Sequence, residues 1–189
     1  MGEHEKSFVD ENELRKIMHQ YGTSILKLTY SYVKNWATAE DIVQETFITY
    51  SQKFYQFKGN SSLKTWLYKI AINKSKDFLK SPKNKLKYLN LTKLKLSSNM
   101  KSPDEEIAKN TEADLVAKCL YKVDIKYREV LILYYYEDLS IKEIVHLLSL
   151  SESNVKTRLN RGRKKFKIHY VKEVEDSGRK ITGAKDVLE

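Results

Sequence analysis

The chain has 189 residues, 41% of them hydrophobic, which is enough for one large domain or two small ones. It holds only two prolines and six glycines, so turn-rich β architectures are excluded and helices are favoured. The formal net charge of +10 suits a polyanionic partner, nucleic acid before membrane, although solubility alone would also account for it.

Residues that would support catalysis or a cofactor are scarce. Cys119 is the only cysteine, which excludes an intrachain disulfide and a cysteine metal cluster. The four histidines are scattered without ligand spacing, and no nucleotide-binding glycine loop, carboxylate pair or nucleophile constellation is visible. We therefore predict a protein that is not an enzyme and that has no cofactor and no metal.

The sequence shows no signal for a membrane. No apolar run approaches the roughly 18 residues that a membrane span needs. Residues 1–10 are charged and lack the apolar core of a signal peptide. These features predict a cytoplasmic protein without direct membrane insertion.

Helical periodicity marks three segments in the first half of the chain. Apolar residues recur three or four apart over 12–34, which predicts a helix with one buried stripe. A second helix is predicted over 38–54, with Thr38 as its N-cap and acidic residues in its first turn. A break at 58–62 precedes a third predicted helix that ends near Pro82.

The composition changes between Ser81 and Pro103, where six lysines and no acid occur. We interpret this stretch as a basic linker between two helical blocks. The final segment, 171–189, is polar with little to bury, which predicts a mobile tail. Between linker and tail, helices are predicted at 104–122, 124–137, 140–148 and 151–170.

The last two of these helices have the pattern of a helix-turn-helix. Ser140 and Glu143 fit a capping box at the start of the first helix. Three residues, Ser149–Ser151, separate the two helices, and Ser151 can cap the second. Two short helices joined by such a turn, the second one polar and cationic, are typical of DNA-binding proteins.

The second helix divides into a packing stripe and a polar face when residues are placed at 100° per step. Val155, Leu159, Gly162 and Phe166 form the stripe, where Gly162 predicts close packing against the rest of the domain. The other side chains can address base edges and phosphates, with an exposed basic helix that binds nothing as the alternative. The predicted DNA-binding set is Ser153, Lys156, Thr157, Arg158, Asn160, Arg161, Arg163 and Lys164.

Two further surfaces stand out in the first half. Acidic and amide side chains share one face of the helix at 38–54, which fits a basic protein partner, although the spacing alone favours an ordinary solvated face. Aromatic residues and lysines gather around Gly59, as expected for binding to unstacked bases. A place in the core explains the aromatic residues Phe54 and Trp66 equally well.

Three motifs together resemble a known family. They are "AEDIVQETFI", "SLKTWLYKIAINKSKDFL" and "YREVLILYYYEDLSIKEIVHLLSLSESNVKTRLNRGRKKF". In this order and at this separation they are similar to the successive regions of extracytoplasmic-function (group IV) sigma factors of bacterial RNA polymerase, within the sigma-70 family. The resemblance covers about residues 12 to 168.

The resemblance implies an all-α protein of two small helical domains joined by a flexible basic linker. It implies a sigma-2 domain at 1–84, a linker at 85–106, a sigma-4 helix-turn-helix domain at 107–170 and a tail at 171–189. It also implies binding to core RNA polymerase, at its β′ clamp helices and β flap, and to the −10 and −35 elements of promoter DNA. Family members are commonly held inactive by an anti-sigma factor, often membrane-anchored, which would hold the protein near the membrane.

The resemblance also assigns roles to residues of this chain. The helix over 151–170 would read the −35 element in the major groove through the set described above. The residues that would dock on the β′ clamp helices are Asp41, Gln44 and Glu45. The residues that would hold the melted −10 strand are Phe57, Lys58, Asn60, Ser61, Ser62, Lys64, Trp66, Lys69 and Asn73.

The chain departs from the family pattern at three points. Its turn lacks the usual glycine, Val145 stands where the family commonly has alanine, and Gly162 replaces another alanine. Two other classes of protein also fit the pattern of residues. A stand-alone helix-turn-helix regulator would bind palindromic duplex DNA tightly without polymerase, and a protein–protein adaptor would show no salt-dependent DNA affinity.

Overall fold

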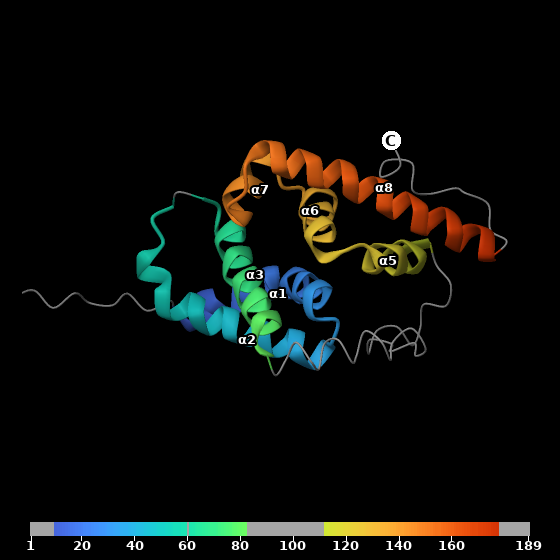
Figure 1. Ribbon diagram of the computed structural model, residues 1–189. Coiled ribbons are helices and arrows are strands. Elements are labelled where there is room, and N and C mark those ends of the chain that lie inside the picture. Colours follow the sequence, from blue (N-terminus) through green and yellow to red (C-terminus); the bar gives the residue numbers. More distant parts are fainter. Residues whose placement is uncertain (1–9, 60, 83–111, 178–189) are drawn as a thin grey trace, which may run out of the picture. The chain divides into compact units, whose positions relative to one another are not determined.

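The computed structural model describes residues 10–59, 61–82 and 112–177. The chain divides into two compact units, Met1–Ser98 and Asn99–Glu189. All regular structure in the described residues is helical, as Figure 1 shows. This confirms the predicted all-α class with two helical domains.

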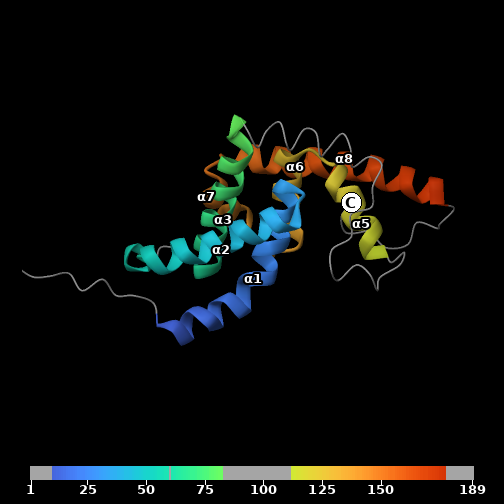
Figure 2. The same cartoon turned by 90° about the horizontal axis from the view of Figure 1, so that it is seen from below.

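The first unit is a bundle of three helices that pack on one another in pairs. These are α1 (Glu11–Val33), α2 (Trp36–Lys53) and α3 (Leu63–Lys80), with a short 3-10 turn, η1 (Phe54–Gln56), after α2. In both Figure 1 and Figure 2, α3 crosses α2. Apolar side chains with at most 4% exposure fill the core: Ile25, Leu28, Tyr32, Ala39, Ile42, Phe47, Tyr50, Leu67, Tyr68, Ala71 and Ile72.

The start of α2 differs from the prediction. Thr38 was expected to cap the helix, but α2 begins at Trp36 and its N-cap is Asn35. The Asn35 Oδ1 atom accepts a hydrogen bond from the Thr38 backbone N–H at 2.9 Å. The reason lies in the preceding residue: Lys34 ends α1 in the left-handed conformation, with φ 52°, so the chain turns at once and the next helix starts earlier.

The second unit is organised around its longest helix. It contains α5 (Glu112–Lys122), α6 (Ile125–Tyr135), α7 (Ile141–Leu148) and α8 (Glu152–Ser177), and α8 contacts each of the other three. Figure 1 shows α8 crossing one end of α6 and continuing past α5. Core side chains with at most 3% exposure are Cys119, Val130, Leu131, Leu133, Ile144, Leu147, Val155, Leu159, Phe166, Tyr170 and Val174.

Helix α8 extends further than predicted. The sequence predicts an end at 170 followed by a mobile tail over 171–189, but the helix continues to Ser177. Val174 is buried, and the Glu173 carboxylate pairs with Lys118, at 2.6 Å, and with Lys122 of α5. These contacts hold the extra turns against α5, so the prediction was wrong for 171–177. The rest of the tail and the linker at 85–106 lie outside the described residues, as does the part of the helix predicted over 104–111.

Both caps of the helix-turn-helix are confirmed. The Ser140 side chain accepts from the Glu143 backbone N–H at 3.3 Å, and Glu143 accepts from the Ser140 backbone N–H at 2.8 Å, which completes the capping box. Ser151 accepts from the Asn154 backbone N–H at 3.2 Å. In the turn, Ser149 takes the left-handed conformation, with φ 54°, which is the conformation that favours glycine.

Gly162 marks the closest approach of α8 to α6. A Cβ atom added at this position would lie 3.1 Å from Leu131 Cγ and 3.2 Å from Leu131 Cδ1. These separations are shorter than ordinary van der Waals contacts, and Leu131 is itself 2% exposed. The packing stripe of α8 is therefore confirmed, and it has little room for an added methyl group at Gly162.

This contact determines whether Gly162→Ala raises or lowers the free energy of unfolding. Gly162→Ala gains about 1 kcal/mol of helix propensity, but the overpacking against Leu131 costs about 1–3 kcal/mol. We expect the free energy of unfolding of the second unit to fall by up to about 2 kcal/mol. Amide hydrogen exchange of α6 and α8 measures this loss within the unit.

A second background tests the cause. Leu131→Ala removes the side chain that the new methyl group would meet, so there Gly162→Ala should raise the free energy of unfolding by about 1 kcal/mol. Because the comparison is made within the Leu131→Ala background, the loss caused by that substitution itself cancels. The same effect of Gly162→Ala in both backgrounds would contradict the close contact.

Candidate nucleic-acid and polymerase interfaces

The predicted polar face of α8 is exposed. Val155, Leu159 and Phe166 are at most 3% exposed and turn toward α6 and α7, which leaves the other side of the helix open. This arrangement confirms the division made from the periodicity. Side chains of the predicted set on the exposed side are Ser153, Lys156, Thr157, Asn160, Arg161 and Lys164.

Two arginines of the predicted set have partners inside the unit. Arg158 Nη1 donates to Glu129 Oε1 of α6 at 2.9 Å, and the Glu129 side chain is only 4% exposed. Arg163 Nε donates to the Tyr135 hydroxyl at 2.7 Å, and its guanidinium lies over the Tyr135 ring at 5.7 Å. Both arginines therefore connect α8 to α6, a role that spacing along the sequence did not indicate.

A cationic cluster surrounds Tyr127, at the start of α6. Lys126 and Lys165 lie over its ring, 5.0 Å and 5.6 Å from the centroid. A hydrogen bond with Arg161 lowers the pKa of the Tyr127 hydroxyl, with a further contribution from the charge of Lys126. Lys165 also pairs with Asp124 at 3.0 Å. The predicted base-reading arginine thus has a neighbour on α6 that sequence reasoning missed, because the two are 34 positions apart.

The first turn of α8 carries an exposed ion pair. Lys156 Nζ lies 2.6 Å from Glu152 Oε1, and both side chains are more than half exposed. The hydrogen bond and charge of Lys156 lower the pKa of the Glu152 carboxyl group. Because exposed ion pairs of this kind are weak in water, Lys156 can exchange its carboxylate partner for a DNA phosphate or base edge at little cost.

The predicted polymerase-binding face lies along the outside of α2. Asp41, Gln44 and Glu45 are all exposed on this helix. One turn further along the same face, the Ile48 side chain is 55% exposed. The spacing of three or four residues from Gln44 and Glu45 could have identified Ile48 from the sequence.

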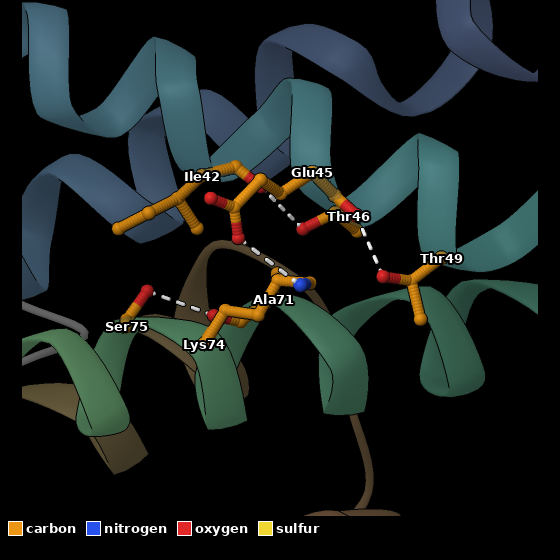
Figure 3. Close-up of polar contacts among 7 residues, drawn as sticks. All are labelled: Ile42, Glu45, Thr46, Thr49, Ala71, Lys74 and Ser75. Atoms are coloured by element: carbon orange, nitrogen blue, oxygen red, sulfur yellow. Dashed lines mark hydrogen bonds and ion pairs between the residues drawn. The ribbon is translucent and has the colours of Figure 1, made fainter.

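Glu45 is held by the neighbouring helix. Lys74 of α3 donates to Glu45 Oε2 at 3.1 Å, as the dashed line in Figure 3 shows. Behind this pair, the hydroxyl groups of Thr46 and Ser75 turn back to carbonyl oxygens of their own helices, at 2.7 Å and 2.8 Å. These small, internally satisfied side chains allow α2 and α3 to pack closely beneath the exposed ion pair.

Aromatic side chains gather beside the loop before α3. The Phe57 ring lies 5.1 Å from that of Trp66 and 6.3 Å from that of Phe54, and the Trp66 ring contacts Tyr50 edge-on at 5.7 Å. Phe57 and Trp66 are half-buried, so each ring supports the core and keeps a surface for a partner. Tyr68, by contrast, is fully buried and belongs to the core.

The remaining predicted −10 residues lie in the loop between η1 and α3 and along α3. Lys58, Ser61, Lys69 and Asn73 are exposed, and Lys64 lies over the Tyr68 ring at 5.5 Å. Ser62 caps α3 by accepting from the Thr65 backbone N–H at 3.1 Å. The turn into the helix uses a positive φ of 70° at Gly59. Asn60 lies outside the described residues.

Within the described ranges, the side chains form no candidate metal site of three or more His, Cys, Asp or Glu residues. No described helix is both long and apolar enough to cross a membrane. The features present are an exposed polar helix in a helix-turn-helix and, in the other unit, aromatic rings among lysines. Such features are typical of a class of protein, the helical factors that bind nucleic acid.

Comparisons with known proteins identify the family. Residues 17–84 match sigma-70 region 2, and residues 113–166 match sigma-70 region 4. SigW of Bacillus subtilis (strain 168), an ECF RNA polymerase sigma factor, is 31% identical over 163 residues, covering 82% of this chain and 87% of the relative. SigV, an RNA polymerase sigma factor of the same organism, is 31% identical over 147 residues, covering 78% and 84%. The chain belongs to the sigma-70 family of RNA polymerase sigma factors, and within it to the extracytoplasmic-function type.

Solved structures share the fold. The sigma factor RpoE in complex with the anti-sigma factor NepR, from Bartonella quintana, matches with a TM-score of 0.60 and 18% identity, covering 84% of this chain and 96% of that chain. As a sigma factor, the chain acts in promoter-specific initiation of transcription, with core RNA polymerase and promoter DNA as its partners. It is a DNA-binding initiation factor and not an enzyme, as predicted.

Proposed function

We propose that α8 reads the −35 element from the major groove. The observation that supports this proposal is that α8, the second helix of the capped helix-turn-helix, exposes Ser, Lys, Thr, Asn and Arg side chains. Such side chains present the donors and acceptors that distinguish base edges. Lys156, Thr157, Asn160 and Arg161 form the reading set, and Ser153 and Lys164 extend it at either end.

We propose that the first unit holds the melted −10 strand beside its aromatic cluster. The half-buried rings of Phe57 and Trp66 offer stacking surfaces for an unpaired base, and the exposed lysines around them suit its phosphates. Trp66, Lys69 and Asn73 recur three and four positions apart on α3, so they face the same side of the helix. A strand that stacks on the rings can therefore follow this face of α3.

We propose that the exposed face of α2 docks on the β′ clamp helices of the polymerase. Asp41 and Glu45 supply negative charge, and Ile48 supplies an apolar contact beside them. An apolar anchor surrounded by charged and polar groups is the usual composition of a protein interface. Ile48 lies on the same face of α2 as Gln44 and Glu45, so apolar and charged groups are combined there.

We also infer that an anti-sigma factor regulates this chain by covering the α2 face. Support comes from two proteins of similar fold, CnrH in complex with the cytosolic domain of CnrY and RpoE in complex with an anti-sigma factor. A partner that occupies Ile48 and the adjacent acids would compete with polymerase. If the partner is membrane-anchored, it would keep this chain in the cytoplasm close to the membrane.

The docking proposal predicts the effect of charge reversal. Asp41→Lys together with Glu45→Lys should reduce binding to core polymerase at least tenfold, because a like charge now faces a basic partner. Gel filtration of the full chain with core polymerase measures assembly, and circular dichroism checks the helix content. Glu40→Lys, on the neighbouring exposed position, is the matched control for an added lysine on α2. Normal assembly of the double variant would remove Asp41 and Glu45 from the interface.

The −35 proposal predicts the effect of losing Arg161. Arg161→Ala should cost about 1–3 kcal/mol of binding at the preferred −35 sequence and relax the preference at one base position. A library of −35 sequences transcribed by the reconstituted holoenzyme measures both effects. Lys167→Ala, an exposed cation of the same helix, is the control and should weaken all sequences alike. An unchanged library profile for Arg161→Ala would exclude this residue from base reading.

Run-off transcription tests the whole mechanism. Purified core polymerase should initiate at a defined promoter start only when this chain is added. Tight binding of the chain alone to palindromic duplex DNA, without stimulation of core polymerase, would instead support the stand-alone regulator.

A further inference from the structure

Three side chains form a chain of hydrogen bonds from the core of the second unit to the surface of α8. Glu129, on α6, accepts from Arg158 Nη1 at 2.9 Å. Arg158 Nε in turn donates to Asn154 Oδ1 at 2.8 Å. The exposed fraction of the side chain rises from 4% at Glu129 to 22% at Arg158, and Asn154 is exposed.

These hydrogen bonds determine which way the Asn154 amide points. An arginine side chain carries donors only, so the atom of Asn154 that faces Arg158 must be the carbonyl oxygen. The NH2 group is consequently turned away from Arg158. Asn154 therefore presents two hydrogen-bond donors on the surface of the helix, while its acceptor is engaged.

Asn154 also lies on the side of α8 that carries Arg161. Seven residues separate the two, and at 3.6 residues per turn they are only about 20° apart around the helix. Asn154 is in the first turn of α8. In helix-turn-helix proteins the N-terminal residues of the recognition helix contact base edges, so this is a position that can reach the groove.

We propose that Asn154 is a further −35 contact residue, and that Arg158 and Glu129 are positioning residues that keep its amide oriented as a donor. The proposal rests on the −35 reading by α8 proposed above. A group that offers donors pairs with acceptors, which in the major groove are guanine O6 and N7 and thymine O4. The two-point pairing of asparagine with adenine needs the carbonyl oxygen as well. Arg158 already occupies one lone pair of that oxygen, so the outward NH2 donors favour guanine or thymine.

The same geometry makes Arg158 a positioning residue for Asn154 and not a contact with a DNA phosphate. Its charge lies beside the carboxylate of Glu129, and two of its donors are engaged within the unit. If Arg158 were a phosphate contact, Glu129 would weaken DNA binding, and removing the carboxylate would strengthen it. If Arg158 positions Asn154, removing the carboxylate should instead loosen the amide and reduce sequence preference. The two roles predict opposite effects of Glu129→Gln.

The experiment uses the full chain with core polymerase and a library of −35 sequences. Asn154→Asp keeps an oxygen for Arg158 but replaces the outward NH2 group by a second oxygen, and Asn154→Ala removes both groups. We expect each to weaken the preferred promoter about fivefold to tenfold and to relax one base position that Arg161→Ala leaves intact. Glu129→Gln should relax the same position to a smaller extent, and it should add nothing to Asn154→Ala.

Several results would overturn the inference. One is a Glu129→Gln variant that binds all −35 sequences more tightly, with a steeper salt dependence. Another is an unchanged library profile for both Asn154 variants while Arg161→Ala relaxes it, which would leave the −35 reading intact. If Arg161→Ala also changes nothing, the −35 reading itself fails and the role of Asn154 fails with it. The Asn154 side chain is exposed, so its variants keep the test valid even if Glu129→Gln unfolds the unit.

Discussion

The second unit depends on a single constraint, the rotation of α8 about its own axis. This helix is the packing partner of α5, α6 and α7, and it also presents the side chains that face outward. A rotation by one residue, about 100°, would bury polar side chains and expose the apolar stripe. Two contacts with α6 fix the rotation: the close approach of Gly162 to Leu131 and the ion pair between Arg158 and Glu129. The reading face is thus a consequence of core packing.

In the first unit, small side chains allow two helices to pack closely. Thr46 and Ser75 are fully buried, and their hydroxyl groups are satisfied by their own helices, so α2 and α3 can approach without leaving these two hydroxyl groups unpaired. The close packing brings Lys74 to Glu45, as Figure 3 shows. The proposed polymerase face on α2 and the proposed DNA face on α3 therefore belong to one bundle, and the ion pair joins the two helices at its surface.

The net charge of +10 overstates the number of cations available to DNA. Arg158, Arg163 and Lys165 each have a partner inside the second unit. Lys118 and Lys122 pair with Glu173, and their hydrogen bonds lower the pKa of that carboxyl group. The pairs of Arg158, Arg163, Lys118 and Lys122 connect helices of the unit, whereas the ion pairs of Lys156 and Lys165 are about half exposed and can be exchanged. The helices packed on α8 therefore determine which of its cations have a structural role and which face DNA.

The sequence by itself determined the helical class, the capping box at Ser140, the apolar stripe of α8 and the family motifs, because each is a pattern along the chain that needs no knowledge of which helices meet in space. It could not determine the partners of Arg158 and Arg161, which lie on α6, 29 and 34 positions away. Nor could it determine that α8 continues to Ser177, because the contact between Glu173 and α5 supports those turns. Periodicity shows which face of a helix is buried. Only packing decides which side chains meet across it, and so which of the exposed cations remain open to DNA.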